Sequence, residues 1–156
     1  MKRCILELPL KRGQIYKSRP STDEVMIFKG KEGIKTLFTD ILKSKVSYEK
    51  LGSEEKFREV LPYFYPQYQR RKVESEIRCR AIYREDERNS NSIKEFIGEK
   101  RFLAKGIPGN ITTVVYGSKV AIFVWKENTV GISINNQEIA DNYRQYFQMV
   151  WETASA

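Results

Sequence analysis

The last third of the chain carries the pattern that most restricts its fold. Three runs rich in β-branched residues alternate apolar and polar side chains, which is typical of strands. The turns at Gly117 and at 126–128 separate these runs at spacings that suit antiparallel hairpins. Apolar residues then recur at helical spacing as far as Trp151, with Asn135 or Asn136 as the cap. The pattern predicts strands at 111–116, 119–125 and 129–134, followed by an amphipathic helix.

The first two thirds of the chain alternate between strand-like and helix-like segments. Pro62 and Pro66 interrupt one helical pattern, because proline lacks an amide donor and clashes with the preceding turn. The segments read in order as strands at 24–29, 45–51, 77–83 and 101–105, a helix that buries Ile34 to Leu42, two short helices within 54–73, and a helix at 92–100 with Ile93, Phe96 and Ile97 inward.

Strand–helix alternation implies parallel pairing, whereas the later hairpins imply an antiparallel edge of the sheet. The expected fold class is therefore α/β (α+β), a mixed β-sheet with flanking helices. A chain of 156 residues suits one domain. We expect that domain at 24–156, after a basic linker at 1–23.

The composition narrows the available chemistry. The chain contains no histidine, which removes the commonest general acid–base and the commonest metal ligand at neutral pH. Cys4 and Cys79 are too few for a disulfide framework or a zinc site, and Cys79 is interpreted as a small buried hydrophobe. We therefore expect no metal and no cofactor. No apolar run could span a bilayer and no signal peptide is visible, so a cytoplasmic protein without a membrane partner is predicted.

Positive charge is concentrated in two places. Residues 1–20 carry five of the eight net positive charges, and such a leader can bind nucleic acid or simply stay solvated, which we favour. A second basic patch runs from Arg70 to Arg84 and includes Arg78 and Arg80 on one face of a predicted strand. This patch can hold a phosphate or a carboxylate, or it is a solvated face balanced by acidic neighbours.

We interpret the aromatic cluster as part of the core and the acidic clusters as exposed surface. The aromatic side chains within 63–68 could stack on bases, but their spacing favours a place in the core. The pair Glu54-Glu55 and the run at 85–87 fall on segments predicted to be exposed, which argues against raised pKa values and acid–base catalysis. No phosphate-binding or nucleophile-elbow motif is present. The residues alone predict an α/β domain without visible catalytic machinery.

Three segments, in this order, resemble the effector region of archaeal TrmB-type transcription regulators. They lie within 24–151 and read VMIFKGKEGIKTLFTDIL, LPYFYPQYQRR before IRCRAIY, and TTVVYGSKVAIFVW followed by VGISINNQEIADNYRQYFQMVW. The resemblance implies a phospholipase-D-like fold and an effector domain that senses a small ligand such as a sugar. It also implies a homodimer that pairs across the region of the enzyme site. DNA would be bound by a winged helix-turn-helix that this chain lacks.

The phospholipase D enzymes use the motif His-x-Lys-x4-Asp-x6-Gly-Ser-x-Asn, with the histidine as nucleophile. Laid along this chain, the motif matches Lys119 and Gly131 but places Gly117 where the histidine should be. The other mismatches are Val124 for the aspartate, Ile132 for the serine and Ile134 for the asparagine. We therefore expect no enzyme and no catalytic residue. The predicted ligand-binding residues are Lys119, Tyr116, Arg78 and Arg80.

Two alternatives stay open. The first is a stand-alone nucleic-acid-binding protein that uses the basic leader and the Arg70–Arg84 patch, with a steep salt dependence of binding. The second is a phosphodiesterase or nuclease with unorthodox residues. Residues 1–23 are too short for a winged helix, so the chain is expected to be an excised effector domain or a stand-alone version of one.

Overall fold

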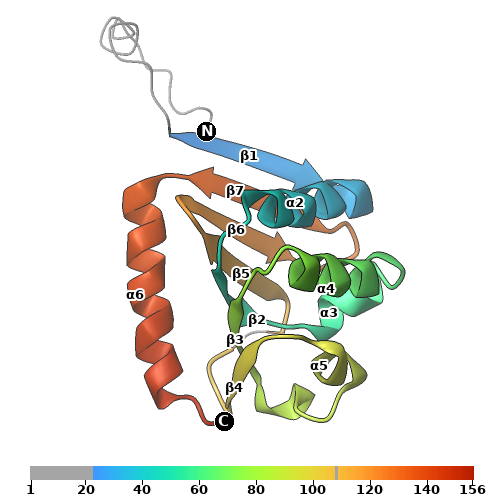
Figure 1. Ribbon diagram of the computed structural model, residues 1–156, viewed down its shortest axis with the longest axis vertical. Coiled ribbons are helices and arrows are strands. Elements are labelled where there is room, and N and C mark those ends of the chain that lie inside the picture. The colour runs from blue at the N-terminus through green and yellow to red at the C-terminus, as the bar shows by residue number, and fades with distance from the viewer. Residues whose placement is uncertain (1–22, 108) are drawn as a thin grey trace, which may run out of the picture.

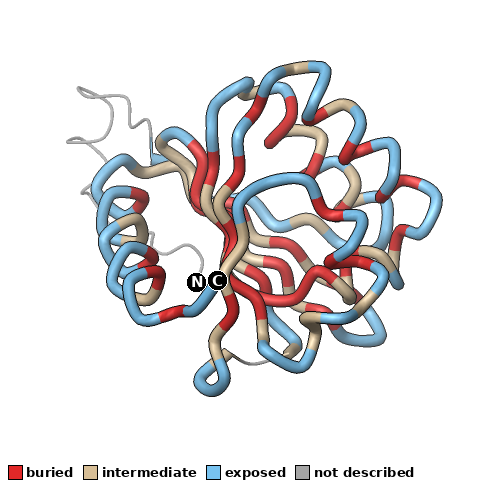
Figure 2. The backbone as a smooth tube through the Cα atoms, turned by 60° about the horizontal axis from the view of Figure 1, so that its bottom comes forward, coloured by how far each residue is buried: buried red, intermediate tan, exposed pale blue. Residues whose placement is uncertain are grey.

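The computed structural model describes residues 23–107 and 109–156, which form three layers. Helix α6 covers one face of a β-sheet, and helices α2 to α5 cover the other (Figures 1 and 2). The strands are β1 (Glu24–Lys29), β2 (Tyr48–Gly52), β3 (Cys79–Arg84), β4 (Glu99–Leu103), β5 (Ile111–Tyr116), β6 (Lys119–Val124) and β7 (Val130–Asn135). The helices are α2 (Gly30–Ser44), α3 (Glu55–Val60), α4 (Phe64–Glu74), α5 (Asn91–Glu95) and α6 (Gln137–Thr153), with a 3-10 turn at Glu85–Glu87.

The mixed sheet with flanking helices is confirmed, and one edge of it is antiparallel as predicted, but the hairpin strands do not form that edge themselves. In the described residues the strand order is β1-β7-β6-β5-β2-β3-β4, so the hairpin strands β5 to β7 lie in the middle. The α2 connection carries the chain from one side of this meander to the other. As a result β1 pairs antiparallel with β7, and β2 pairs antiparallel with β5. Parallel pairing is confined to β2, β3 and β4.

Most predicted elements are confirmed, and their ends have physical causes. The Asn136 side chain accepts a hydrogen bond from the Ile139 amide at 2.8 Å and caps α6. The predicted helix at 92–100 is too long, because α5 ends at Glu95. Gly98 has a φ of +150°, and a Cβ there would come within 2.8 Å of the Cys79 carbonyl oxygen. The chain therefore leaves the helix and enters β4, and Ile97 is exposed rather than inward.

The main core lies between the sheet and α2 to α4, and aromatic rings fill it. Phe38 stacks on Phe57 with ring centroids 3.8 Å apart and on Phe123 at 4.2 Å. Phe64, Tyr65 and Tyr68 are buried in the same cluster, so the core interpretation of this segment is confirmed for them. Tyr63 is exposed and lies outside the core. Cys79 is buried, as predicted.

The prediction that Glu54 is exposed is wrong. Its side chain is fully buried, because four neighbours satisfy the carboxylate. The Lys50 amine forms an ion pair with it, the hydroxyls of Tyr65 and Tyr83 donate at 2.6 and 2.7 Å, and the Gln69 amide donates at 3.2 Å. Burial alone would raise the pKa of Glu54, but Lys50 and Tyr65 lower it below its ordinary value.

Lys72 also departs from prediction, because it lies in the core instead of the basic patch. It shares a helix face with Tyr65, Tyr68 and Gln69, and its side chain is 1% exposed. Its amine lies 4.3 Å from the centroid of the Phe96 ring and has no hydrogen-bond partner in the described residues. Burial lowers the pKa of Lys72 below its ordinary value of 10.5. The core therefore favours the neutral amine.

The two buried lysines should respond oppositely to replacement by methionine. Lys72→Met removes a group that is costly to bury and should raise the free energy of unfolding by about 1–3 kcal/mol. Lys50→Met strands the Glu54 carboxylate and should lower the same quantity by about 3–5 kcal/mol. Urea unfolding of both variants measures the difference. A loss of stability in Lys72→Met similar to that in Lys50→Met would contradict this account.

The pH dependence of stability provides a second readout of Lys72. Because the pKa of Lys72 is lowered in the folded state, the unfolded chain binds more protons than the folded chain between the two pKa values. Stability should therefore rise with pH through the window that lies below the ordinary lysine pKa of 10.5. The Lys72→Met variant should lose this part of the slope.

Candidate functional site

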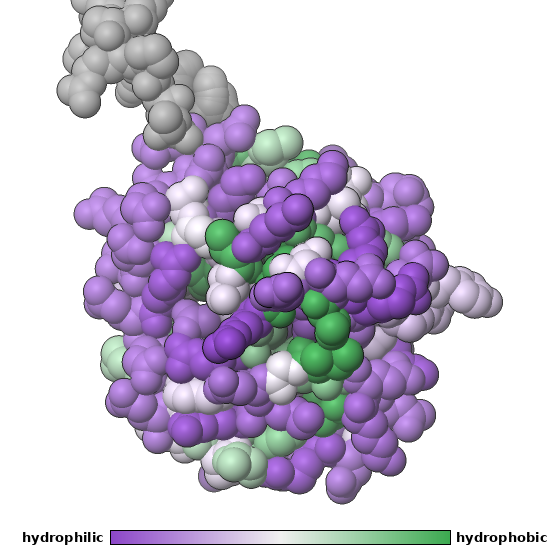
Figure 3. Space-filling model, viewed as in Figure 1, coloured by the Kyte–Doolittle hydropathy of each residue, from purple (hydrophilic) through white to green (hydrophobic). Residues whose placement is uncertain are grey.

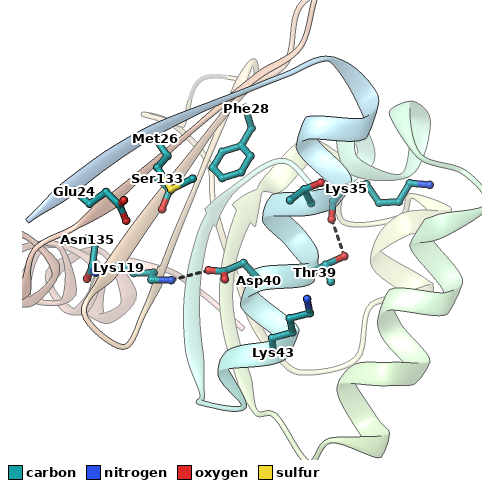
Figure 4. A pocket seen from close by; sticks show the side chains of 11 residues that line it. Glu24, Met26, Phe28, Lys35, Thr39, Asp40, Lys43, Lys119, Ser133 and Asn135 are labelled. Carbon is teal, nitrogen blue, oxygen red and sulfur yellow. Dashed lines mark hydrogen bonds and ion pairs between the residues drawn. The ribbon is translucent and has the colours of Figure 1, made fainter. Parts of the chain in front are cut away.

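A pocket opens between β1, α2, β6 and β7 (Figure 4), and we call it the Asp40 pocket. Its volume is about 380 Å³. The side chains that line it come from β1 (Glu24, Met26, Phe28), α2 (Lys35, Thr36, Thr39, Asp40, Lys43), β6 (Lys119) and β7 (Ser133, Asn135). The lining combines lysines with carboxylates, hydroxyls and an amide, so it can contact a polar ligand through both donors and acceptors.

Asp40 connects the helix α2 to the sheet at this pocket. Its Oδ2 accepts a hydrogen bond from the Tyr116 hydroxyl at 2.8 Å and one from the Lys119 amine at 3.0 Å (Figure 4 draws the second). Burial is the largest cause that raises the pKa of Tyr116 above its ordinary value of 10.0. The hydrogen bond to Asp40 and the negative charge of Asp40 raise it further. The tyrosine therefore acts as a neutral donor. Two of the predicted ligand-binding residues, Tyr116 and Lys119, are brought together here.

The register of β6 and β7 shifts the serine and asparagine places of the motif by one residue relative to the gapless alignment. Lys119 pairs with Asn135 across the two strands, and Ala121 pairs with Ser133. Ser133 and Asn135 line the Asp40 pocket beside Lys119. Side chains alternate along a strand, so Ile132 and Ile134 face the opposite side of the sheet. The pocket therefore has a lysine, a serine and an asparagine on one surface, although a gapless alignment places isoleucines there.

The glycines of the motif comparison have separate explanations. Gly131 lies under α2, where a Cβ would come within 2.8 Å of the Leu37 side chain, so its match to the motif has a packing cause. Gly117 forms the turn between β5 and β6 with a φ of +59°. It stands in the histidine place of the motif and offers no side chain to the pocket.

The other two predicted residues, Arg78 and Arg80, lie at a different site. They line a cleft of about 620 Å³ at the start of β2, β3 and β4, beside α6. We call it the Arg78 cleft. The Arg70–Arg84 segment does not form one basic surface, because Lys72 is buried and Arg84 pairs with Asp86 at 2.5 Å. The four predicted ligand-binding residues thus divide into two pairs.

Several site residues could not be assigned from the sequence. Asp40 is one acidic residue on an amphipathic helix, and nothing in its local pattern distinguishes it. Ser133 and Asn135 do carry a signal, since they repeat the serine-x-asparagine spacing two residues after Gly131 instead of one. The described residues contain no group of three or more histidine, cysteine or carboxylate side chains arranged to share a metal ion. None of the described helices is long and apolar enough to cross a membrane.

Comparison with known proteins identifies the fold. No protein-family model matches the chain, and no curated protein matches it in sequence. Among solved structures, TrmBL2, an archaeal chromatin protein described as showing a novel mode of DNA binding, superposes with a TM-score of 0.60 at 11% identity. The match covers 92% of this chain but 58% of TrmBL2.

Two further solved structures also superpose. NucT from Helicobacter pylori matches with a TM-score of 0.62 at 12% identity, covering 86% of this chain and 99% of NucT. Nuc from Salmonella typhimurium, a phospholipase D family member, matches with a TM-score of 0.61 at 12% identity, covering 85% of this chain and 96% of Nuc. The chain has a phospholipase-D-like fold. The superpositions establish the fold. At sequence identities this low the activity has to be inferred from the site.

The hydrogen bonds of Asp40 predict that Asp40→Ala and Lys119→Ala will lower the free energy of unfolding by different amounts. Asp40→Ala leaves the Tyr116 hydroxyl without its carboxylate acceptor and should lower the free energy of unfolding by about 1–3 kcal/mol. Lys119→Ala breaks only a half-exposed ion pair and should cost less than about 1 kcal/mol. Urea unfolding measures both variants. Equal costs would mean that Asp40 acts mainly through Lys119 and not through Tyr116.

Proposed function

We propose that this chain is a non-catalytic effector and dimerisation domain of a TrmB-like transcription regulator. The observation that carries the proposal is the Asp40 pocket, which retains the lysine of the phospholipase D motif but has Gly117 in the nucleophile place. A phospholipase D nucleophile must attack phosphorus, and glycine has no side chain with which to do so. No histidine exists elsewhere in the chain to replace it.

The state of Lys119 also favours a binding role. In this pocket its amine is 3.0 Å from the Asp40 carboxylate, so part of its charge is already neutralised. The hydroxyl of Ser133 and the amide of Asn135 add donors and acceptors beside it. Such a set suits reversible recognition of a small polar effector, including a sugar, whose hydroxyls both donate and accept.

Similarity in fold to TrmBL2 supports DNA as the eventual partner. This chain spans about 58% of TrmBL2, so any DNA-binding activity of the whole neighbour is a proposal for this protein. We assign DNA contact to a winged helix-turn-helix outside this sequence and assign dimerisation to the phospholipase-D-like domain. A dimer would present two DNA-binding domains to two half-sites.

The rim of the Asp40 pocket supports homodimerisation at that place. Strand β1 is an edge strand in the described sheet and forms one wall of the pocket. Val25, Met26 and Ile27 on this strand are exposed, and Figure 3 shows hydrophobic side chains at the edge of the molecule where β1 lies. An exposed apolar edge strand is an association surface unless another surface covers it. A second copy that covers β1 would bring two Asp40 pockets together.

The dimer makes a direct prediction for one exposed side chain. Met26 is 45% exposed on β1, and Met26→Arg should convert a dimer into a monomer because it places a charge in an apolar contact. Val73→Arg is the matched control, since Val73 is 52% exposed on α4, away from β1. Light scattering at micromolar concentration measures both variants. A monomeric parent chain, or a dimer unaffected by Met26→Arg, would argue against this interface.

The proposal also predicts that the chain has no phosphodiesterase activity. The chain should not hydrolyse bis(p-nitrophenyl) phosphate or DNA above the rate of buffer, because the nucleophile is missing. Lys119→Ala is the control for any trace activity: hydrolysis that this variant abolishes would overturn the non-catalytic assignment. Binding of the chain alone to DNA at low salt, lost steeply as salt rises, would favour the stand-alone nucleic-acid-binding alternative.

A further inference from the structure

The layer between α6 and the sheet is not uniformly apolar. One apolar cluster gathers around Ile82, Phe147 and Trp151, and a second gathers around Val115, Val120 and Ala140. Between them the sheet presents Glu49 and Arg80, both partly buried. Charged side chains in such a layer are costly unless each is paired, and one carboxylate oxygen of Glu49 is buried without a hydrogen-bond partner among the described residues.

These side chains form a row across four strands. Val115 on β5 pairs with Glu49 on β2, Glu49 pairs with Arg80 on β3, and Arg80 pairs with Glu99 on β4. Helix α6 adds Arg144, which lines the same Arg78 cleft. The row therefore forms the floor of this cleft, in which cations and carboxylates alternate.

Part of the row is fixed by its own contacts. Arg80 forms an ion pair with Glu49, donates to the Gln148 side chain at 3.2 Å, and packs its guanidinium 5.2 Å and 5.0 Å from the ring centroids of Phe147 and Trp151. Arg144 is held by Asp141 at 3.1 Å and by the Gly117 carbonyl. These arginines are pre-positioned before any ligand arrives.

Other groups of the cleft lack partners among the described residues. Oε1 of Glu49 is buried and receives no hydrogen bond. Arg78 and Glu99 are exposed at the cleft, and neither makes an ion pair or a side-chain hydrogen bond with a residue that the structure describes. The cleft thus presents an unused cation and an unused carboxylate, and its lining also includes Ile77, Ile97 and Val115.

The geometry points to a binding site for a free α-amino acid with an aliphatic side chain. The carboxylate of the ligand would bind Arg78, with Arg144 nearby, and its ammonium group would bind Glu99. The aliphatic side chain would contact the isoleucine and valine wall. A cleft of about 620 Å³ is within the usual range for small-molecule sites. The site is separate from the Asp40 pocket and does not depend on the proposed function.

An NMR titration of the full chain with each standard amino acid tests the site. Leucine or another aliphatic amino acid should shift the amide signals of the cleft, with a dissociation constant of about 1 mM or tighter. For leucine, 4-methylpentanoate lacks the ammonium group and 3-methylbutylamine lacks the carboxylate. Each analogue should bind at least about tenfold more weakly, because one end of the ligand loses its ion pair.

Single-charge variants locate the binding. Arg78→Ala and Glu99→Gln should each weaken binding at least about tenfold, because each removes one of the unpaired charges. Arg70→Ala is the matched control, since Arg70 is an exposed arginine whose ion-pair partner within the described part of the chain is Glu74 on its own helix, at 3.8 Å. Absence of binding for every amino acid at about 10 mM would overturn the proposal. Binding that Arg70→Ala weakens as much as Arg78→Ala would overturn it as well.

Discussion

The packing of α3 and α4 on the parallel strands depends on the hydrogen bonds and the ion pair of the buried Glu54 carboxylate. Lys50 comes from β2, Tyr83 from β3, and Tyr65 and Gln69 from α4, and all four converge on one side chain. A carboxylate in a low-dielectric interior must be fully satisfied, so the positions of these elements are coupled. Oε1 of Glu87 also accepts the amides of Glu54 and Glu55 at 3.1 and 3.2 Å, which fixes the start of α3. The parallel strands and their helices therefore form one unit.

The antiparallel side of the molecule is organised by the α2 crossover. Because α2 carries the chain past the meander, β1 returns to pair with β7 and the helix lies over both strands. Asp40 on the inner face of α2 then reaches Tyr116 and Lys119 on the sheet. The same crossover leaves β1 at the edge with apolar side chains exposed. A polar pocket and an exposed apolar edge strand are thus adjacent consequences of one connection.

In this phospholipase-D-like fold a glycine stands in the nucleophile place of the motif, while polar side chains still line the pocket beside it. Lys119, Ser133 and Asn135 lie on one surface because strand pairing puts them there, whatever the pocket does. The Arg78 cleft on the α6 face is built from different strands and faces the opposite side of the sheet. The fold therefore offers two polar sites whose roles have to be argued from their own residues.

Local pattern determined most of the elements, whereas pairing and burial were decided by the tertiary structure. Alternation and helical spacing predict β1, β5, β6, β7 and α6 closely, because these signals depend on residues a few positions apart. The two pairings that place the meander in the middle of the sheet, β1 with β7 and β2 with β5, join residues more than 50 positions apart, and no local pattern records them. The same applies to Glu54 and Lys72, which look like surface charges until distant rings and hydroxyls enclose them. The sequence by itself excluded histidine chemistry; only the folded chain placed Asp40, Ser133 and Asn135 beside Lys119, since that grouping requires α2 to cross the sheet.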